Sequence, residues 1–198
     1  MLVDLHKVTS HGSLKLPWLT LLIGTFAVGL YLWAGPAAPA WVFDRIAIGQ
    51  GEWWRLFTGH FVHSDLSHLQ WDIVAFVVIA GMLEQQSRRL ILSGLSAGFL
   101  VIGGWLWWGE PELLYYCGLS GINHTLLVLL FHQLWKGGAH PLLFVSGLAV
   151  VAKMIVELVS NQALFTNTAW PSLPSAHVAG VAAAVLFLII QQRQSRAC

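Results

Sequence analysis

The sequence predicts an all-α polytopic membrane protein whose fold is a bundle of six spanning helices. Hydrophobic residues make up 57% of its 198 residues and charged residues only 10%, whereas a soluble domain carries about 25% charged residues. The apolar residues also gather in six runs, and a helix needs a run of about 20 residues to cross the hydrocarbon core of a bilayer. Composition and run length together therefore favour spanning helices over a soluble core.

The six predicted spans follow one another closely, and turn-forming Gly and Pro residues separate them. They cover about 17–33, 60–83, 90–108, 118–135, 141–160 and, after Pro171 and Pro174, as far as 190. We expect one six-helix core, 17–191, between a short cytoplasmic N-terminal tail, 1–16, and a cytoplasmic C-terminal tail, 192–198.

The first span has a second interpretation, as a cleaved signal peptide. Lys7 and Lys15 precede its apolar run, and the small residues at 37–40 follow it, as at a cleavage site. However, the run is longer than the apolar region of a usual signal peptide, and its removal would leave five spans. A retained first helix is therefore favoured.

Basic residues predict the orientation, because Lys and Arg collect in cytoplasmic loops. With the N-terminus in the cytoplasm, the inner side holds Lys7, Lys15, Arg88, Arg89, Lys136, Arg193 and Arg196, and the outer side holds Arg45 and Arg55. Tryptophans, which favour the interfaces, agree: Trp105 and Trp108 fall at an outer end, and Trp18 and Trp135 at inner ends. Both termini are therefore expected in the cytoplasm.

Composition also excludes several function classes. The formal net charge is +1, and no basic stripe of the kind that binds nucleic acid is present, so we expect membrane lipids and no nucleic acid as partners. Cys117 and Cys198 can build neither a disulfide framework nor a cysteine-based metal site.

Ionisable groups inside predicted spans indicate function, because they are costly in a bilayer. The second span carries His60, His63, Asp65, His68 and Asp72, the fourth Ser120, Asn123 and His124, and the sixth Ser175 and His177. These three spans all start at the outer face, so their polar groups are expected at similar depth. A lone histidine is more often a structural hydrogen-bonding group, but convergence from three helices favours a single site.

Ser120 and His177 are the predicted nucleophile and base. Ser120 stands at a helix start, where free N–H groups and the positive end of the helix dipole would stabilise an oxyanion, and Gly118 and Gly121 allow close approach of another backbone. Small residues at 176, 180 and 184 form a close-packing face that would bring His177 to the serine. A Ser–His pair is chemically sufficient for acyl transfer.

These residues resemble the rhomboid intramembrane proteases over the whole six-span core. The resemblance is carried by Gly118-Leu119-Ser120-Gly121, by Ala176-His177-Val178-Ala179-Gly180, and by Trp54-Arg55 ahead of His63 and His68. It implies a rhomboid-like bundle with a cofactor-free Ser–His dyad in a water-filled cavity. The cavity would open to the periplasmic side of a bacterial inner membrane, and the enzyme would cleave transmembrane proteins near their outer end.

Within the family, the chain is similar to the rhombosortases. That similarity rests on the compact length, on Gly51-Glu52-Trp53-Trp54-Arg55 and on Trp71-Asp72. It implies substrates with a C-terminal Gly-Gly-type membrane anchor, and an acyl-enzyme resolved either by water or by another nucleophile.

Two positions depart from the rhomboid pattern. Rhomboids usually carry Asn four residues after the second-helix histidine, but here His68 is followed by Asp72. An ionised Asp cannot donate a hydrogen bond to an oxyanion, so we expect Asp72 to orient His68, which would form the oxyanion hole with the Ser120 N–H. His124 replaces a Tyr that packs on the catalytic His in many rhomboids. It shares a helix face with Ser120, so it either supports His177 or competes with it as base; His177 is favoured.

The histidines of the second span are also compatible with a metal site or a haem site. His60, His63, His68 and Asp72 could be metal ligands, but this leaves Ser120 and His177 unexplained, so no metal or cofactor is expected. Paired histidines could also ligate haem, but no matching pairs on facing helices are evident.

Lys153 and Glu157 either form an ion pair within their helix or meet the polar end of a substrate. The rivals to a protease are a non-catalytic rhomboid-like protein that binds transmembrane helices and a His-lined transporter. The first usually lacks the Ser or the His, and the second would need paired broken helices that this sequence lacks.

Overall fold

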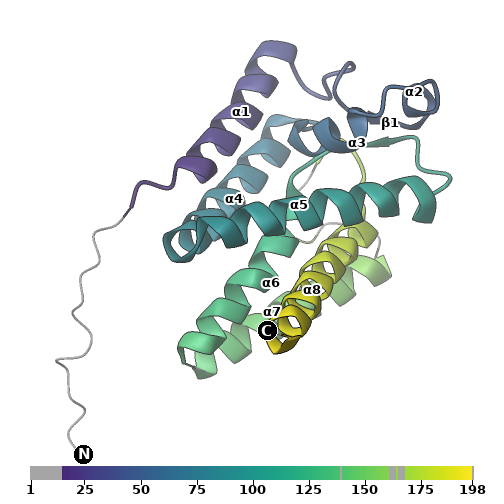
Figure 1. The fold of residues 1–198 in the computed structure, drawn as a ribbon. Coiled ribbons are helices and arrows are strands. Elements are labelled where there is room, and N and C mark those ends of the chain that lie inside the picture. The colour runs from purple at the N-terminus through teal and green to yellow at the C-terminus, as the bar shows by residue number, and fades with distance from the viewer. Residues whose placement is uncertain (1–14, 139, 161–163, 165–167, 198) are drawn as a thin grey trace, which may run out of the picture.

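The computed structural model describes residues 15–138, 140–160, 164 and 168–197. The regular structure is almost entirely helical, as predicted (Figure 1). Lys7 and most of the predicted N-terminal tail lie outside the described residues. The elements are α1 (Trp18–Ala34), β1 (Phe43–Asp44), α2 (Arg45–Gly49), α3 (Arg55–Thr58), η2 (Gly59–Phe61), α4 (Leu66–Gln86), α5 (Arg88–Gly104), η3 (Trp105–Gly109), β2 (Tyr115–Tyr116), α6 (Ser120–Gly137), α7 (Pro141–Ser160) and α8 (Pro174–Ala197).

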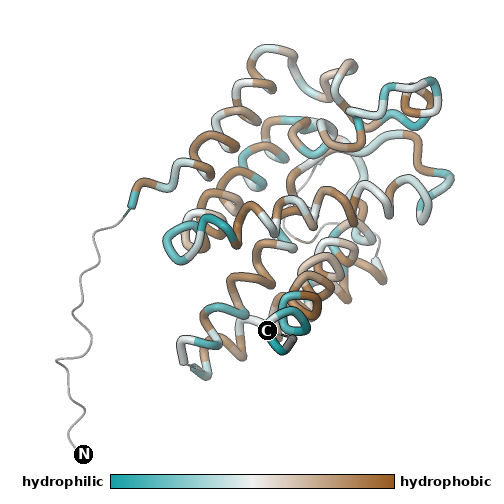
Figure 2. Tube along the Cα trace, viewed as in Figure 1, coloured by the Kyte–Doolittle hydropathy of each residue, from teal (hydrophilic) through white to brown (hydrophobic). Residues whose placement is uncertain are grey.

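Four helical segments among the described residues are long and apolar enough to cross a membrane: α4, α5 continued by η3, α7 and α8. α1 is a shorter apolar helix of 17 residues. α6 is 18 residues long and carries polar side chains in its first turns. Figure 2 shows apolar residues along the helices and hydrophilic ones mainly at their ends and in the loop after α1. The prediction of six crossings stays a prediction.

The second helix begins later than predicted, and this moves two histidines out of it. α4 starts at Leu66 instead of near residue 60, because Asp65 caps it by accepting a hydrogen bond from the His68 N–H at 2.9 Å. An Asp at this position stops a helix from extending backwards, since its side chain takes the place of the preceding turn. His60 therefore lies in the short 3₁₀ helix η2, and His63 lies in the extended connection between η2 and α4.

The third span ends within one residue of its prediction, whereas the last helix runs further than predicted. The third span is an α-helix as far as Gly104 and continues as the π-helical turn η3 to Gly109. At this end of the helix, the Arg45 guanidinium donates hydrogen bonds to the backbone carbonyls of Leu106, Trp107, Glu110 and Leu113. The sixth helix continues past residue 190 to Ala197, so most of the predicted C-terminal tail is helical.

The loop after α1 is tied to the segment that precedes Ser120. β1 and β2 form an antiparallel pair in which Phe43 lies opposite Tyr116, a pairing that the apolar pattern did not predict. Arg55 braces the loop, with Glu52 at 2.6 Å and the Val42 carbonyl at 3.0 Å. The loop thus holds the entry to α6 in place.

α6 lies against α4, α5, α7 and α8, and its most extensive contact is with α8. Figure 1 shows these helices packed around α6. A Cβ on Gly180 would overlap the carbonyl oxygen of Gly121, so the two backbones touch there. The Thr125 hydroxyl donates a hydrogen bond to the Gly180 carbonyl at 2.9 Å. Ala176 and Ala184 are also fully buried, which confirms the predicted small-residue face.

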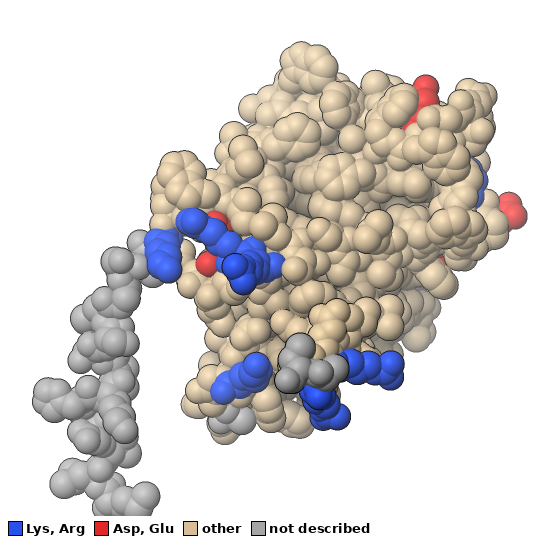
Figure 3. All heavy atoms as spheres, viewed as in Figure 1, with Lys and Arg blue, Asp and Glu red and all other residues tan. Residues whose placement is uncertain are grey.

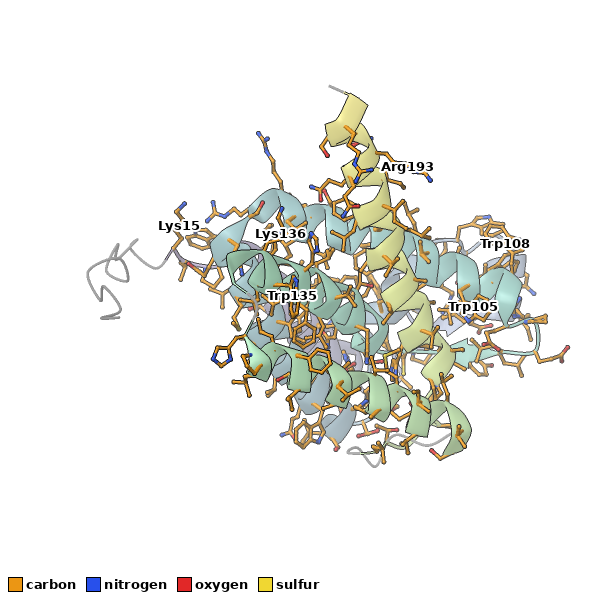
Figure 4. The ribbon with its side chains drawn as sticks, turned by 90° about the horizontal axis from the view of Figure 1, so that it is seen from below. Lys15, Trp105, Trp108, Trp135, Lys136 and Arg193 are labelled. Atoms are coloured by element: carbon orange, nitrogen blue, oxygen red, sulfur yellow. The ribbon has the colours of Figure 1, made fainter. Side chains whose placement is uncertain are left out.

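Charged side chains separate along the molecule. Most basic side chains in view gather at the lower left and bottom of Figure 3, and acidic side chains also occupy the opposite, upper right end. Figure 4 shows Lys15 and Lys136 on the left of the view and Trp105 and Trp108 on the right, with Arg193 between them near the end of α8. The orientation in the membrane that the sequence predicts stays a prediction.

Candidate active site

Ser120 is the first residue of α6, and the turn before it depends on Gly118. Gly118 has a φ of +118°, a left-handed conformation that side chains rarely adopt, and a Cβ there would lie 2.6 Å from His68 Nε2. The next residue, Leu119, donates its backbone N–H to Asp72 Oδ2 at 2.8 Å. The start of α6 is therefore fixed directly against α4.

His177 lies one turn into α8 and reaches the serine from the neighbouring helix. Its Nε2 lies 3.0 Å from Ser120 Oγ, a hydrogen-bonding distance, and the residue is only 7% exposed. The contact depends on the α6–α8 crossing at Gly121 and Gly180. The structure thus brings together the two residues that the sequence paired.

His124 stacks on His177. Their ring centroids are 4.3 Å apart and their planes differ by 14°. His124 Nδ1 lies 2.7 Å from the Ser120 carbonyl oxygen, which can only accept, so this nitrogen donates. Among the described residues, His177 is the histidine that contacts the Ser120 hydroxyl. The geometry therefore favours His124 as a residue that supports the His177 ring over His124 as the base.

Asp72 gathers donors from three segments. Its Oδ2 accepts the Leu119 N–H and lies 3.2 Å from His63 Nε2 and 3.4 Å from His68 Nε2. The expected Asp72–His68 contact is present, whereas the part played by His63 was not foreseen. Asn123 Nδ2 donates to the Asp72 carbonyl at 3.1 Å, so α4 and α6 are joined at this point by side chain and backbone alike.

Glu157 of α7 also reaches the site. Its Oε1 lies 2.7 Å from Lys153 Nζ, so the ion pair expected within this helix is present. Its Oε2 lies 3.4 Å from His177 Nδ1, a contact that was not foreseen. The sequence gives the helical spacing of Lys153 and Glu157, but it does not give the direction in which α7 faces.

These side chains line one cavity with a volume of about 1070 Å³, comparable with the roughly 300–1,000 Å³ of pockets that bind small ligands. Its walls come from α4, α6, α7, α8 and the segments before α6 and α8. The polar and aromatic lining includes His68, Trp71, Asp72, Tyr116, Ser120, Asn123, His124, Lys153, Glu157, Trp170 and His177.

Two buried groups beside the cavity stay uncharged. Burial lowers the pKa of His60 to about 4, partly offset by an interaction with the Gly118 backbone, so its ring is neutral. Burial and the charge of Asp72 raise the pKa of Tyr116 far above its usual range. The Tyr116 hydroxyl is therefore protonated, and it donates to the Gly118 carbonyl at 3.3 Å.

The proposed metal ligands do not converge as a set. His60 packs against Phe99 and Tyr116, while His63 and His68 face Asp72. Across the described ranges, no group of three or more His, Cys, Asp or Glu residues has a geometry that could hold a metal ion.

Asp65 connects the segment before α8 to the start of α4. Its Oδ2 accepts the Ala169 N–H at 2.7 Å, and its Oδ1 caps α4. Burial favours the neutral acid, but the hydrogen bonds from the Ala169 and His68 backbones and from Ser64 outweigh it and hold the pKa of Asp65 below its ordinary value.

This depressed pKa predicts a loss of stability in acid. Asp65 is ionised and fully stabilising at neutral pH, and its contribution is lost as the pH falls below the ordinary range of an aspartate. We expect the melting temperature of the wild-type protein to fall in strong acid, and Asp65→Asn to reduce that dependence. At neutral pH the variant should be less stable by about 1 kcal/mol, because the amide nitrogen of Asn cannot accept the Ala169 N–H. Thermal unfolding in detergent across a pH series measures both effects, and an unchanged pH dependence in the variant would contradict the assignment.

Comparison with known proteins agrees with this geometry. The Rhomboid domain family matches residues 50–194, which include both Ser120 and His177. A Bacillus subtilis (strain 168) protein described as "Putative rhomboid protease YdcA" is 25% identical over 160 residues, which cover 77% of this chain and 75% of that protein. Because the family match spans most of the sequence and the helices are apolar and long, this chain is an integral membrane protein that belongs to the rhomboid family.

Proposed function

We propose that the protein is an intramembrane serine endopeptidase with Ser120 as nucleophile and His177 as general base. The observation that carries this proposal is the 3.0 Å contact between Ser120 Oγ and His177 Nε2 at the start of a helix that lines a large cavity. Membership of the rhomboid family supports an intramembrane protease function. The reaction needs no metal or cofactor.

The proposed reaction is acyl transfer in two stages. His177 Nε2 takes the proton from Ser120 Oγ as the oxygen attacks the peptide carbonyl, and the carbonyl electron pair moves onto its oxygen. When the tetrahedral intermediate collapses, the C–N bond breaks and His177 gives its proton to the leaving amine. A water molecule, activated in turn by His177, then hydrolyses the ester.

The oxyanion requires donors near the start of α6. We assign this role to the Ser120 backbone N–H and to His68, which lines the cavity. Asp72 cannot donate when ionised; its position 3.4 Å from His68 Nε2 supports the role of orienting that ring. Because Gly118 has no side chain, it leaves room for the His68 ring.

The topology that accompanies this function has six spans, with α1 and α6 as the two shorter ones. Both termini would lie in the cytoplasm and the cavity would open to the periplasm of a bacterial inner membrane. The separation of Lys15 and Lys136 from Trp105 and Trp108 supports this orientation.

For the substrate, we propose a transmembrane protein with a C-terminal Gly-Gly-type anchor, as in the rhombosortases. The strings Gly51-Glu52-Trp53-Trp54-Arg55 and Trp71-Asp72 support this narrower assignment, and Trp71 is among the residues that line the cavity. Release of the acyl-enzyme by an amine in place of water would make the protein in part a transferase.

A fluorophosphonate probe tests the proposed nucleophile, because such probes react with activated serines. The detergent-solubilised wild-type protein is expected to be labelled, and Ser120→Ala is expected to lose all labelling at unchanged melting temperature. Labelling that survives in Ser120→Ala would assign the reactivity to another residue. A folded wild-type protein that is not labelled would favour the non-catalytic protein that binds transmembrane helices.

Replacing Asp72 is expected to have a smaller effect on labelling than replacing Ser120. Asp72→Asn keeps an oxygen that can accept the Leu119 N–H but removes the charge that orients His68. We expect the labelling rate to fall about tenfold, the equivalent of one charge-assisted hydrogen bond. A rate equal to that of the wild-type protein would contradict the electrostatic role of Asp72.

A further inference from the structure

α7 turns a single buried residue toward the rest of the protein. All 20 residues of this helix are described, and among them only Glu157 is buried, at 1% exposure. The rest of the helix is exposed or half-buried and mostly apolar, as suits a surface that faces lipid. A carboxylate is a costly residue to bury in a spanning helix, so its contacts should explain its presence.

The two oxygens of Glu157 have different surroundings. Oε1 accepts hydrogen bonds from Lys153 Nζ at 2.7 Å and from the Leu164 backbone N–H at 3.0 Å. Oε2 lies 3.4 Å from His177 Nδ1. Within the part of the chain that the structure describes, Oε2 and Nδ1 are both buried and neither has a hydrogen-bond partner of ordinary geometry. The ion pair with Lys153 therefore explains the position of Oε1 but not that of Oε2.

The chemistry of His177 requires an acceptor at this place. When Nε2 accepts the Ser120 proton, the neutral ring carries its own proton on Nδ1. A buried N–H group without an acceptor is costly, and Glu157 Oε2 faces it. The distance is longer than that of an ideal hydrogen bond, but hydrogen bonds of catalytic groups are often long in unliganded enzymes.

The other groups around His177 do not offer this contact. His124 stacks on the ring face, Ser120 takes Nε2, and Lys153 is already paired with Glu157. The charged residues of α5, which also packs against α8, are Arg88 and Arg89 in its first turn.

We infer that Glu157 is a positioning residue that turns the Ser120–His177 pair into a triad, with Lys153 and the Leu164 N–H holding the carboxylate. Glu157 fixes the tautomer of His177 with the proton on Nδ1 and stabilises the imidazolium that forms when the ring takes the serine proton. This inference rests on the proposed function, because it assigns a role within the same reaction.

The test compares Glu157→Gln with a matched control, Glu84→Gln. Glu84 is also a buried glutamate in a spanning helix, at 4% exposure, but it binds the start of α1 through Leu19 and Thr20. Fluorophosphonate inactivation is measured as a function of probe concentration, which separates the maximal rate from the apparent affinity. We expect Glu157→Gln to lower the maximal rate by roughly 10- to 50-fold with the affinity unchanged, and Glu84→Gln to leave both unchanged.

Two further measurements separate a positioning role from a structural one. ¹⁵N NMR of histidine-labelled protein, with the His177 signal assigned from His177→Ala, should show the proton on Nδ1 in the wild type and a mixture of tautomers in Glu157→Gln. Glu157→Asp keeps the charge, so it should restore the wild-type tautomer and part of the rate. This variant also keeps the test valid if Glu157→Gln fails to fold.

The outcomes distinguish the inference from the proposed function. A wild-type rate and tautomer in Glu157→Gln would overturn the triad while leaving Ser120 and His177 in place. Equal losses in Glu157→Gln and Glu84→Gln, without a change of tautomer, would also overturn it. Labelling that persists in Ser120→Ala would instead remove the proposed function and the triad together.

Discussion

Replacing His177 by Gln is expected to lower the rate of fluorophosphonate labelling by about 10³-fold or more, because the serine loses its general base. His124→Phe is expected to lower the rate about tenfold or less, since a phenyl ring keeps the stacking on His177 and loses only one hydrogen bond. In the structure, His177 Nε2 faces Ser120 Oγ, whereas His124 Nδ1 faces the Ser120 carbonyl. The two variants therefore separate the base from its support.

The comparison needs both proteins folded. Melting temperatures in the same detergent provide the control, and each rate is compared at equal folded fraction. If His124→Phe lost the activity and His177→Gln retained it, the roles of the two rings would be exchanged. Equal and complete losses would show that the His124 hydrogen bond to the Ser120 carbonyl is also required for reactivity, because the phenyl ring keeps the stack.

Adding one methyl group at the crossing of α6 and α8 is expected to have the next largest effect. In Gly180→Ala the new Cβ would overlap the Gly121 carbonyl oxygen, so α8 must move away from α6. His177 is carried on α8 one turn earlier, and a misplacement of a catalytic group by about 1 Å costs roughly 10²-fold in rate. Labelling rates and melting temperatures of the variant measure the displacement and its cost.

Gly81→Ala is the matched control for this change. It is also a glycine-to-alanine substitution within a long helix, and a Cβ there has no atom of another residue within 4 Å. We expect wild-type reactivity and a stability equal to or slightly above that of the wild type, because Ala favours a helix over Gly. Wild-type reactivity in Gly180→Ala would mean that the crossing tolerates a wider separation than its geometry indicates.

The sequence predicts most of the bundle, because the length and the ends of apolar runs are local properties. The fifth predicted span, 141–160, coincides with α7, which begins at Pro141. The approach of His177 to Ser120 was also predictable, because the small residues at 176, 180 and 184 mark the face on which the last helix can pack closely against a neighbouring helix.

Other features depend on contacts that are distant in the sequence. The start of α4 was predicted too early because His60 and His63 lie in a polar-apolar stretch that a capping Asp65 interrupts. The pairing of β1 with β2 joins segments about 70 residues apart, which no local pattern indicates. The contact of Glu157 with His177 depends on the rotation of α7 about its own axis, and lipid-facing helices with apolar residues on every side leave that rotation undetermined.

The single buried residue of α7 has a thermodynamic consequence. Elements with few buried contacts open locally at a lower free energy than the rest of a protein, and Glu157 is the one fully buried residue of α7, whose other residues are exposed or half-buried. Each departure of α7 from the bundle therefore also removes the carboxylate from His177. Hydrogen exchange of the α7 backbone and the chemical competence of Ser120 should accordingly follow the same opening equilibrium, so that the enzyme is assembled only while this helix is docked.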